Sequence, residues 1–155
     1  MPVLTISGSL RANSLNTKIL RFAARAALPG VDIHLCDALD RLPHFNPDLD
    51  TDSGPAVTTF RAQLNGADAV VICSPEYAHG VPGALKNALD WVVGSGEFVG
   101  KPVALWNLST RAVDAHASLV EALQTMSALV LPEACFTCLG IYLLVDRLDR
   151  EARKD

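Results

Sequence analysis

Residues 69–91 read AVVICSPEYAHGVPGALKNALDW, and this stretch decides the fold. It opens with an apolar strand segment at Ala69 to Ser74, passes through a loop with two prolines and two glycines, and ends in a helical pattern at Pro82 to Val93. A strand that is apolar on consecutive positions is typical of a parallel sheet buried on both faces. The stretch therefore predicts one strand–loop–helix unit of a parallel α/β sheet.

The same unit recurs along the chain. Further strand segments are expected at Val3 to Ser7, Val31 to Leu35, Val103 to Leu108 and Leu129 to Phe136, again buried on both faces. Further helices are expected at Leu15 to Leu28, Ala56 to Leu64, Val113 to Met126 and Ile141 to Arg153. Alternating strands and helices with right-handed crossovers favour a doubly wound, three-layer α/β/α sheet in the order 2-1-3-4-5. We expect one domain over residues 1–155.

Composition excludes several classes of protein. Half of the residues are apolar, 19% are charged and the net charge is −4, which predicts a soluble globular domain without a basic surface for nucleic acid or anionic membrane. No apolar run approaches the roughly 18 to 20 residues of a membrane span, and the N-terminus does not look like a signal peptide. We therefore expect a cytoplasmic location. The cysteines Cys36, Cys73, Cys135 and Cys138 are expected to be free thiols.

Ligands of doubly wound sheets bind at the carboxyl ends of the strands, so the loops there are the candidate site. The first, Ser7 to Asn16, lacks the glycine pattern of a dinucleotide site and the Gly-Lys-Ser/Thr ending of a triphosphate loop. It offers hydroxyls, amides, Arg11 and a helix N-terminus, which suit a terminal phosphate monoester. The alternative is that Ser14 only caps the helix and Arg11 is a solvated surface charge.

The second loop, Ser74 to Gly83, follows the central strand. Its glycines and prolines fix a backbone path whose N–H and C=O groups can face the edge of a ligand. In the helix that follows, Lys86 and Asp90 are predicted to form a surface pair. Trp91 is expected to lie in the core or an interface. The long segment Arg41 to Pro55 is predicted to be a functional loop.

Two motifs in these loops resemble a known family. Ser-x-Arg-x-x-Ser-x-Asn spans residues 9–16, and Ser-Pro-Glu-Tyr-x-x-Gly-x-Pro-Gly-x-x-Lys-Asn-Ala-x-Asp-Trp spans residues 74–91. Together they are similar to the NAD(P)H-dependent FMN reductases, which include quinone, azo-dye and chromate reductases. The resemblance implies a flavodoxin-like fold, noncovalently bound FMN, and a homodimer or homotetramer.

The resemblance also implies which residues bind the cofactor. Those expected around the FMN phosphate are Ser9, Arg11, Ser14, Leu15 and Asn16. Those expected along the isoalloxazine ring are Pro75, Glu76, Tyr77, Ala78, His79 and Gly80, with N–H groups of this loop stabilising charge on the ring. A third loop, Asn107 to Arg111, is expected to close the far side of the flavin through Ser109 and Thr110.

The sequence departs from the family pattern in the second loop. Ala78 stands where many members carry Asn, and His79 stands where others have a small residue. His79 is predicted either to lie over the edge of the flavin or to be an exposed residue without a special role.

The implied activity is transfer of hydride from NADH or NADPH to bound FMN and then to a small acceptor such as a quinone, azo compound, free flavin or metal oxyanion. A ping-pong order is expected, with no catalytic protein residue and no metal ion, because the flavin carries the chemistry. One alternative is a flavodoxin-like electron carrier that does not oxidise NAD(P)H itself, although such carriers tend to be more acidic than −4. Another is a flavin-free interaction module that kept only the fold.

Several remaining residues have competing interpretations. Cys135 and Cys138 form a Cys-x-x-Cys pair, for which a structural role is favoured over a redox or zinc site because no second ligand pair is present. The histidines His34, His44 and His116 are expected to be surface or hydrogen-bonded residues. The stretch Trp91 to Val93 is either part of a dimer face or part of the core.

Overall fold

A five-stranded parallel sheet forms the centre of the molecule. The computed structural model describes residues 1–134, apart from the side chains of Asp52 and Glu133. The strands are β1 (Pro2–Ser7), β2 (Asp32–Leu35), β3 (Ala69–Cys73), β4 (Pro102–Trp106) and β5 (Leu129–Val130). Neighbouring strands pair in parallel in the order β2-β1-β3-β4-β5. The predicted fold class and strand order are confirmed.

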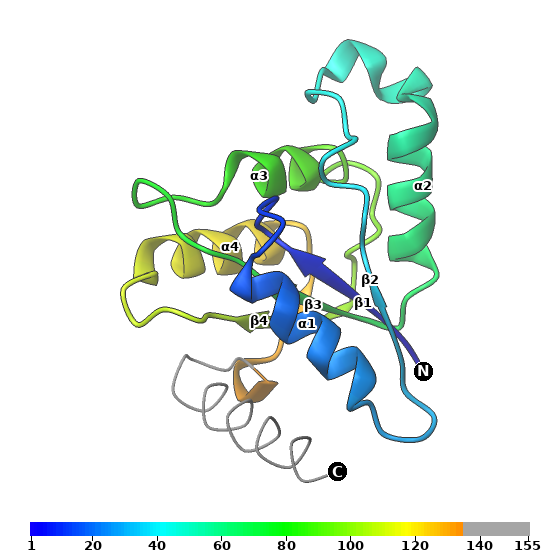
Figure 1. Cartoon of the computed structure of the whole chain (residues 1–155). Helices are drawn as coiled ribbons and strands as arrows, with labels where there is room; N and C mark the ends of the chain where they lie inside the picture. The colour runs from blue at the N-terminus through cyan, green and yellow to red at the C-terminus, as the bar shows by residue number, and fades with distance from the viewer. Residues whose placement is uncertain (135–155) are drawn as a thin grey trace, which may run out of the picture.

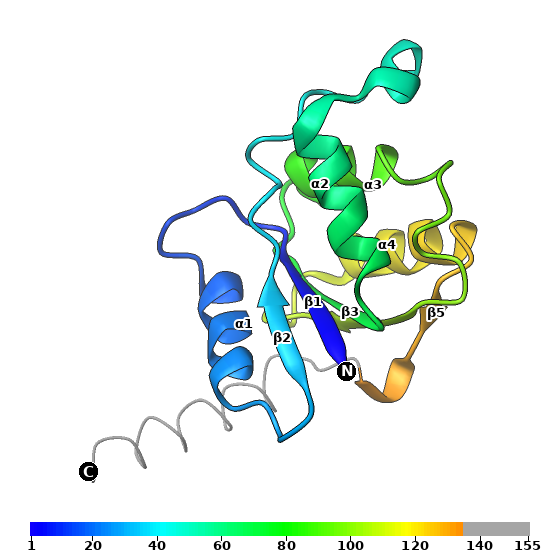
Figure 2. The same cartoon turned by 90° about the vertical axis from the view of Figure 1, so that its right-hand side faces the viewer.

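Helices cover both faces of this sheet (Figures 1 and 2). Helix α1 (Leu15–Arg25) lies on one face, and α2 (Gly54–Asn65), α3 (Gly83–Asp90) and α4 (Val113–Thr125) lie on the other. The larger core includes Phe60, Leu85 and Leu123, each fully buried, and the smaller core beneath α1 includes Ile19 and Leu20. Within the described part of the chain, no helix combines the length and apolar character needed to cross a bilayer.

Two elements are shorter than expected, and each is followed by a proline. Helix α1 ends at Arg25 rather than Leu28: Ala26 is its C-cap, and Pro29 disfavours the helical conformation at Leu28. Strand β5 ends at Val130 rather than Phe136, because Pro132 cannot donate a ladder hydrogen bond and begins the 3₁₀ turn Pro132–Ala134. The predicted helix at residues 141–153 lies outside the described residues.

Strand β2 corrects the expectation that every strand is buried on both faces. Its residues alternate between exposed Asp32 and His34 and half-buried Ile33 and Leu35. His34 Nε2 lies 2.8 Å from Asp32 Oδ2 on the exposed side. This edge strand therefore follows the period of two that its sequence already contains, polar outward and apolar inward.

The loop after β2 is tied to helix α3. The amide of Asn87 donates from Nδ2 to the carbonyl of Pro43 at 2.9 Å and accepts at Oδ1 from the backbone N–H of Phe45 at 2.7 Å. Trp91 Nε1 also donates to the Pro43 carbonyl, at 2.8 Å. Asn87 and Trp91 of the second motif thus hold a distant loop in place.

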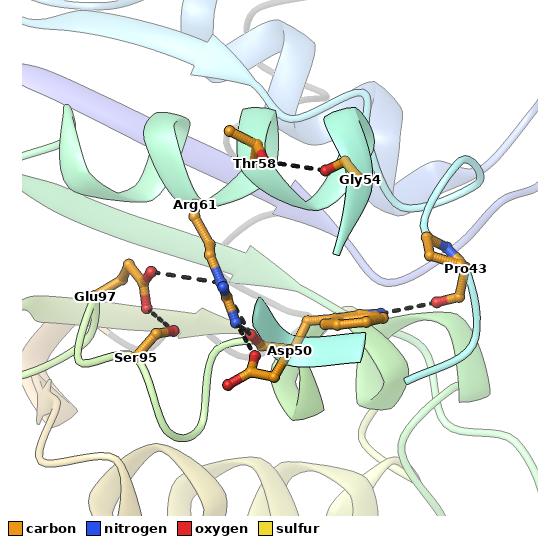
Figure 3. Close-up of polar contacts among 8 residues, drawn as sticks. Pro43, Asp50, Gly54, Thr58, Arg61, Ser95 and Glu97 are labelled. Atoms are coloured by element: carbon orange, nitrogen blue, oxygen red, sulfur yellow. Dashed lines mark hydrogen bonds and ion pairs between the residues drawn. The ribbon is translucent and has the colours of Figure 1, made fainter. Parts of the chain in front are cut away.

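Helix α2 fixes the other half of this loop through Arg61 (Figure 3). The guanidinium donates from Nη2 to Asp50, in the 3₁₀ helix η1 (Pro47–Asp52), and to the carbonyl of Trp91, both at 2.6 Å. Its Nε lies 3.8 Å from the carboxylate of Glu97, a residue only 7% exposed. Contacts from α2, Asn87 and Trp91 therefore hold the long loop in place, and its functional role stays a prediction.

The residues after α3, Trp91 to Val93, were predicted to be either part of a dimer face or part of the core. Trp91 and Val92 are each 1% exposed and belong to the core, whereas Val93 is 53% exposed. A dimer face at this end of α3 would therefore contain Val93 but not its two neighbours. The predicted surface pair of Lys86 and Asp90 is confirmed.

Candidate functional site

Three loops at the carboxyl edge of the sheet enclose a pocket of about 280 Å³. They follow β1, β3 and β4, whose carboxyl ends meet at the position where doubly wound sheets bind their ligands. The residues that line the pocket are Leu15, Asn16, Ser74, Pro75, Glu76, Leu108, Ser109, Arg111 and Ala112. A larger pocket, of about 540 Å³, lies beside the start of β1 and the end of α2, away from the point where these loops converge.

Gly8 allows the first loop to pass directly against β3. Its N–H donates to the carbonyl of Cys73 at 2.9 Å. A Cβ atom at this position would lie 2.4 Å from Ser74 Oγ, closer than real side-chain contacts allow. The backbone of the first loop therefore reaches the pocket only with glycine at residue 8.

Two serines of the first motif shape the loop from within. Ser14 caps α1 by accepting a hydrogen bond from the N–H of Thr17 at 3.4 Å, as the capping alternative proposed. Ser9 Oγ accepts from the N–H of Arg11, also at 3.4 Å. Both serines are buried and neither lines the pocket, so these hydroxyls hold the loop in the form that presents its other donors.

The start of α1 leaves several hydrogen-bond donors unused. Within residues 1–134, the backbone N–H groups of Leu15 and Asn16 have no acceptor, as expected in the first turn of a helix. Asn16 is 8% exposed, and in the same residues its Nδ2 also has no acceptor, although it is not among the fully buried atoms without a partner. Arg11 is exposed and has no ion-pair partner in the same part of the chain. Unused donors, a helix N-terminus and a free guanidinium fit an anion such as a phosphate.

The second loop closes into a tight turn. Tyr77 and Gly80 exchange backbone hydrogen bonds of 3.1 and 3.0 Å, and Ala78 and His79 have φ values of 49° and 58°. Positive φ at both central positions is the pattern of a type I′ turn. Because the turn uses the N–H groups of Tyr77 and Gly80, the expectation that N–H groups along the whole loop face a ligand is wrong for these two.

Glu76 connects the second loop to helix α4. Its Oε2 accepts a 2.9 Å hydrogen bond from the N–H of Ala115 in the first turn of α4. The helix has Ala112 at its N-cap position, which cannot cap it, so Glu76 supplies the missing acceptor. This role of Glu76 was not predicted from the sequence, where its one signal is the lack of a capping residue before α4.

His79 lies at the surface beside the same helix. Its side chain is 85% exposed, and Nδ1 lies 2.8 Å from Asp114 Oδ2 and 3.7 Å from Glu76 Oε1. The structure therefore favours the exposed alternative for His79 but gives it a partner. Ligand atoms of these three side chains lie within 4.8 Å of one another, and all three are already engaged by protein groups.

Asn107 shapes the third loop. Its Oδ1 accepts from the N–H of Ser109 at 2.9 Å, and its Nδ2 donates to the carbonyl of Ala112 at 2.7 Å. Ser109 lines the pocket as expected, whereas Thr110 is exposed and does not. The lining residues that the sequence analysis did not assign to the site are Ser74, Leu108, Arg111 and Ala112.

The described cysteines are free, as predicted. Cys36 and Cys73 are both buried, and burial raises their thiol pKa values to about 11 and about 12. Cys135 and Cys138 lie outside the described residues. His34 and His44 are exposed and His116 is half-buried, which agrees with the interpretation of all three as surface or hydrogen-bonded residues.

Comparison with known proteins identifies the family. The family model described as NADPH-dependent FMN reductase matches residues 1–138. The chain belongs to this family. An NAD(P)H-dependent FMN reductase of Pseudomonas aeruginosa is 42% identical over 69% of this chain and 59% of its own length. A quinone reductase of Escherichia coli K12 is 35% identical over 68% of this chain and 58% of its own length.

Two solved structures share the fold of this chain. The flavoenzyme NAD(P)H:(acceptor) oxidoreductase FerB from Paracoccus denitrificans superposes with a TM-score of 0.76 at 33% identity, covering 86% of this chain and 77% of that one. An azoreductase from Bacillus anthracis superposes with a TM-score of 0.65 at 17% identity, over 89% and 87% of the two chains, and supports the fold alone. The chain spans about half the length of the curated relatives it matches.

Proposed function

We propose that this protein is an NAD(P)H-dependent FMN oxidoreductase that reduces small acceptors of the quinone class. The observation that carries the proposal is the pocket of three loops, which joins unused donors at the N-terminus of α1 to a wall formed by Pro75 and Glu76. Membership of the NADPH-dependent FMN reductase family supports FMN as the ligand of that pocket. Curated relatives named quinone reductases support the class of acceptor.

The phosphate of FMN is bound at the start of α1. The free N–H groups of Leu15 and Asn16 and the Asn16 amide supply neutral donors, and Arg11 supplies a charge. Hydrogen bonds to a charged group contribute roughly 1.5 to 3 kcal/mol each, and the helix N-terminus adds up to about 2 kcal/mol. A few such contacts offset the cost of association, so micromolar binding is within reach.

The ring of FMN lies between the second and third loops. Pro75 presents a flat surface without an N–H, Leu108 supplies apolar area, and Ser109 supplies a polar edge. Bound FMN supplies the redox chemistry, accepting two electrons from the nicotinamide and passing them to the acceptor. The protein residues bind and orient the partners, which use the exposed face of the site in turn, in a ping-pong order.

A flavin titration and an oxidation assay test this function. The purified protein is expected to quench FMN fluorescence with a micromolar or lower Kd, and to oxidise NADH or NADPH when a quinone is added. An acceptor panel with azo compounds, free flavin and metal oxyanions then ranks the substrates. FMN binding without NAD(P)H oxidation indicates the electron-carrier alternative, and absence of FMN binding indicates a flavin-free module.

A further inference from the structure

A buried thiol contacts one of the pocket residues. Cys73 Sγ, at the carboxyl end of β3, lies 3.2 Å from Asn16 Oδ1, in the first turn of α1. Cys73 is fully buried and Asn16 is 8% exposed. The contact joins two elements that are 57 residues apart in sequence, directly behind the wall of the pocket.

The chemistry of this contact fixes which way the Asn16 amide faces. Burial raises the pKa of the Cys73 thiol to about 12, so the sulfur keeps its proton at neutral pH. An S–H group donates to the amide oxygen but cannot donate to the amide nitrogen, which has no free lone pair. The oxygen therefore faces Cys73, and the nitrogen faces the other way.

The nitrogen is the part of Asn16 that remains for a ligand. Asn16 lines the pocket, and within residues 1–134 its Nδ2 has no acceptor. Asn16 Nδ2 is not among the fully buried atoms without a partner, so it faces the open pocket, where an anion can take the place of water as its acceptor.

We propose that Cys73 is a positioning residue for the cofactor, holding the Asn16 amide so that its nitrogen donates to the phosphate of FMN. The proposal rests on the proposed function, because it takes FMN as the occupant of the pocket. Without the thiol, the amide can rotate by 180° and turn its oxygen toward the phosphate, an arrangement that repels the anion. Cys73 acts through Asn16 and does not itself touch the ligand.

The test measures FMN affinity in cysteine variants by fluorescence titration. Cys73→Ala is expected to raise the Kd for FMN about three- to tenfold, the range of one lost hydrogen bond. Cys73→Ser keeps a donor and is expected to stay within about twofold of the wild type. Cys36→Ala is the matched control, because Cys36 is also a buried thiol but packs in the larger core, whereas Cys73 packs beneath α1 and contacts Asn16. It is expected to lower the unfolding midpoint without changing the Kd.

A double-mutant cycle separates positioning from a general structural effect. In an Asn16→Ala background, Cys73→Ala is expected to cause no further loss of FMN affinity, because its effect passes through the missing amide. An unchanged Kd in Cys73→Ala, or an equal loss with and without Asn16, would overturn the inference while leaving the proposed function intact. A wild-type protein that does not bind FMN would overturn both.

Discussion

Arg11 tests the phosphate site at the scale of a single residue. Arg11→Ala is expected to weaken FMN binding by roughly 1.5 to 3 kcal/mol, because it removes a charged donor beside the α1 N-terminus. Turnover at saturating FMN is expected to change little, since the proposed site places Arg11 at the phosphate and not at the ring. Titration with FMN and with riboflavin measures the effect, because riboflavin lacks the phosphate and should be insensitive to the change.

Arg21→Ala is the matched control for this variant. Arg21 is exposed on the same helix but lies farther from its N-terminus, so the variant removes the same charge without removing a phosphate contact. Equal losses in the two variants would assign the effect to net charge rather than to the site.

A substitution at Ala78 tests whether the backbone of the second loop is strained. Its φ of 49° belongs to the left-handed region, which alanine adopts at a cost and glycine does not. Ala78→Gly is therefore expected to stabilise the folded state by about 1 kcal/mol, despite the greater entropy of glycine in the unfolded chain. Urea denaturation measures the change, and Ala84→Gly, within helix α3, should destabilise instead.

At the scale of elements, Glu76 couples the second loop to α4. Glu76→Ala removes the carboxylate that accepts from the N–H of Ala115, which is expected to cost about 1 kcal/mol of folding free energy. Glu121→Ala removes an exposed carboxylate from the same helix and should have a much smaller effect. Chemical denaturation of the two variants compares the losses, and equal values would contradict the capping role of Glu76.

The strand order and most helices could be predicted because their signals are local. Continuous apolar runs and their alternation with helical patterns determine the parallel sheet. The brace on the loop after β2 could not be predicted in this way. Asn87 and Pro43 are 44 residues apart, and nothing in the sequence near either residue indicates that they are partners. The second motif could be recognised in the sequence, but only the structure shows that Asn87 and Trp91 hold the loop after β2.

The site was predictable at the level of loops and less so at the level of atoms. The pocket lies among the three expected loops, but buried Ser9 and Ser14 accept from backbone N–H groups of the first loop and of α1, and Tyr77 and Gly80 bond to each other. The hydrogen bonds that a loop forms within itself depend on its folded conformation. The sequence pattern does not determine that conformation. Arg111 was missed for the same reason, because its loop was expected to contribute only hydroxyls.

At the scale of the whole molecule, the two buried thiols make folding stability depend on alkaline pH. The folded pKa values of about 11 for Cys36 and about 12 for Cys73 exceed the ordinary value of 9.0, so the folded state holds protons that the unfolded chain releases. The stabilisation is complete below pH 9 and is lost as the pH rises toward 11 and 12. Each thiol contributes at most about 1.4 kcal/mol per pH unit in this window.

Thermal unfolding between pH 8 and 10.5 measures this dependence. The unfolding temperature is expected to fall above pH 9, and Cys36→Ala, which removes one of the thiols, should fall less steeply over the same range. Identical slopes for the two proteins would show that other groups, such as lysines and tyrosines, account for the loss.

A crystal structure of the protein soaked with FMN tests the central claim most directly. We predict the phosphate at the first turn of α1, within hydrogen-bond distance of Asn16 Nδ2, and the ring against Pro75 between the second and third loops. Density for FMN elsewhere, or a pocket that stays empty at saturating FMN, would contradict the account.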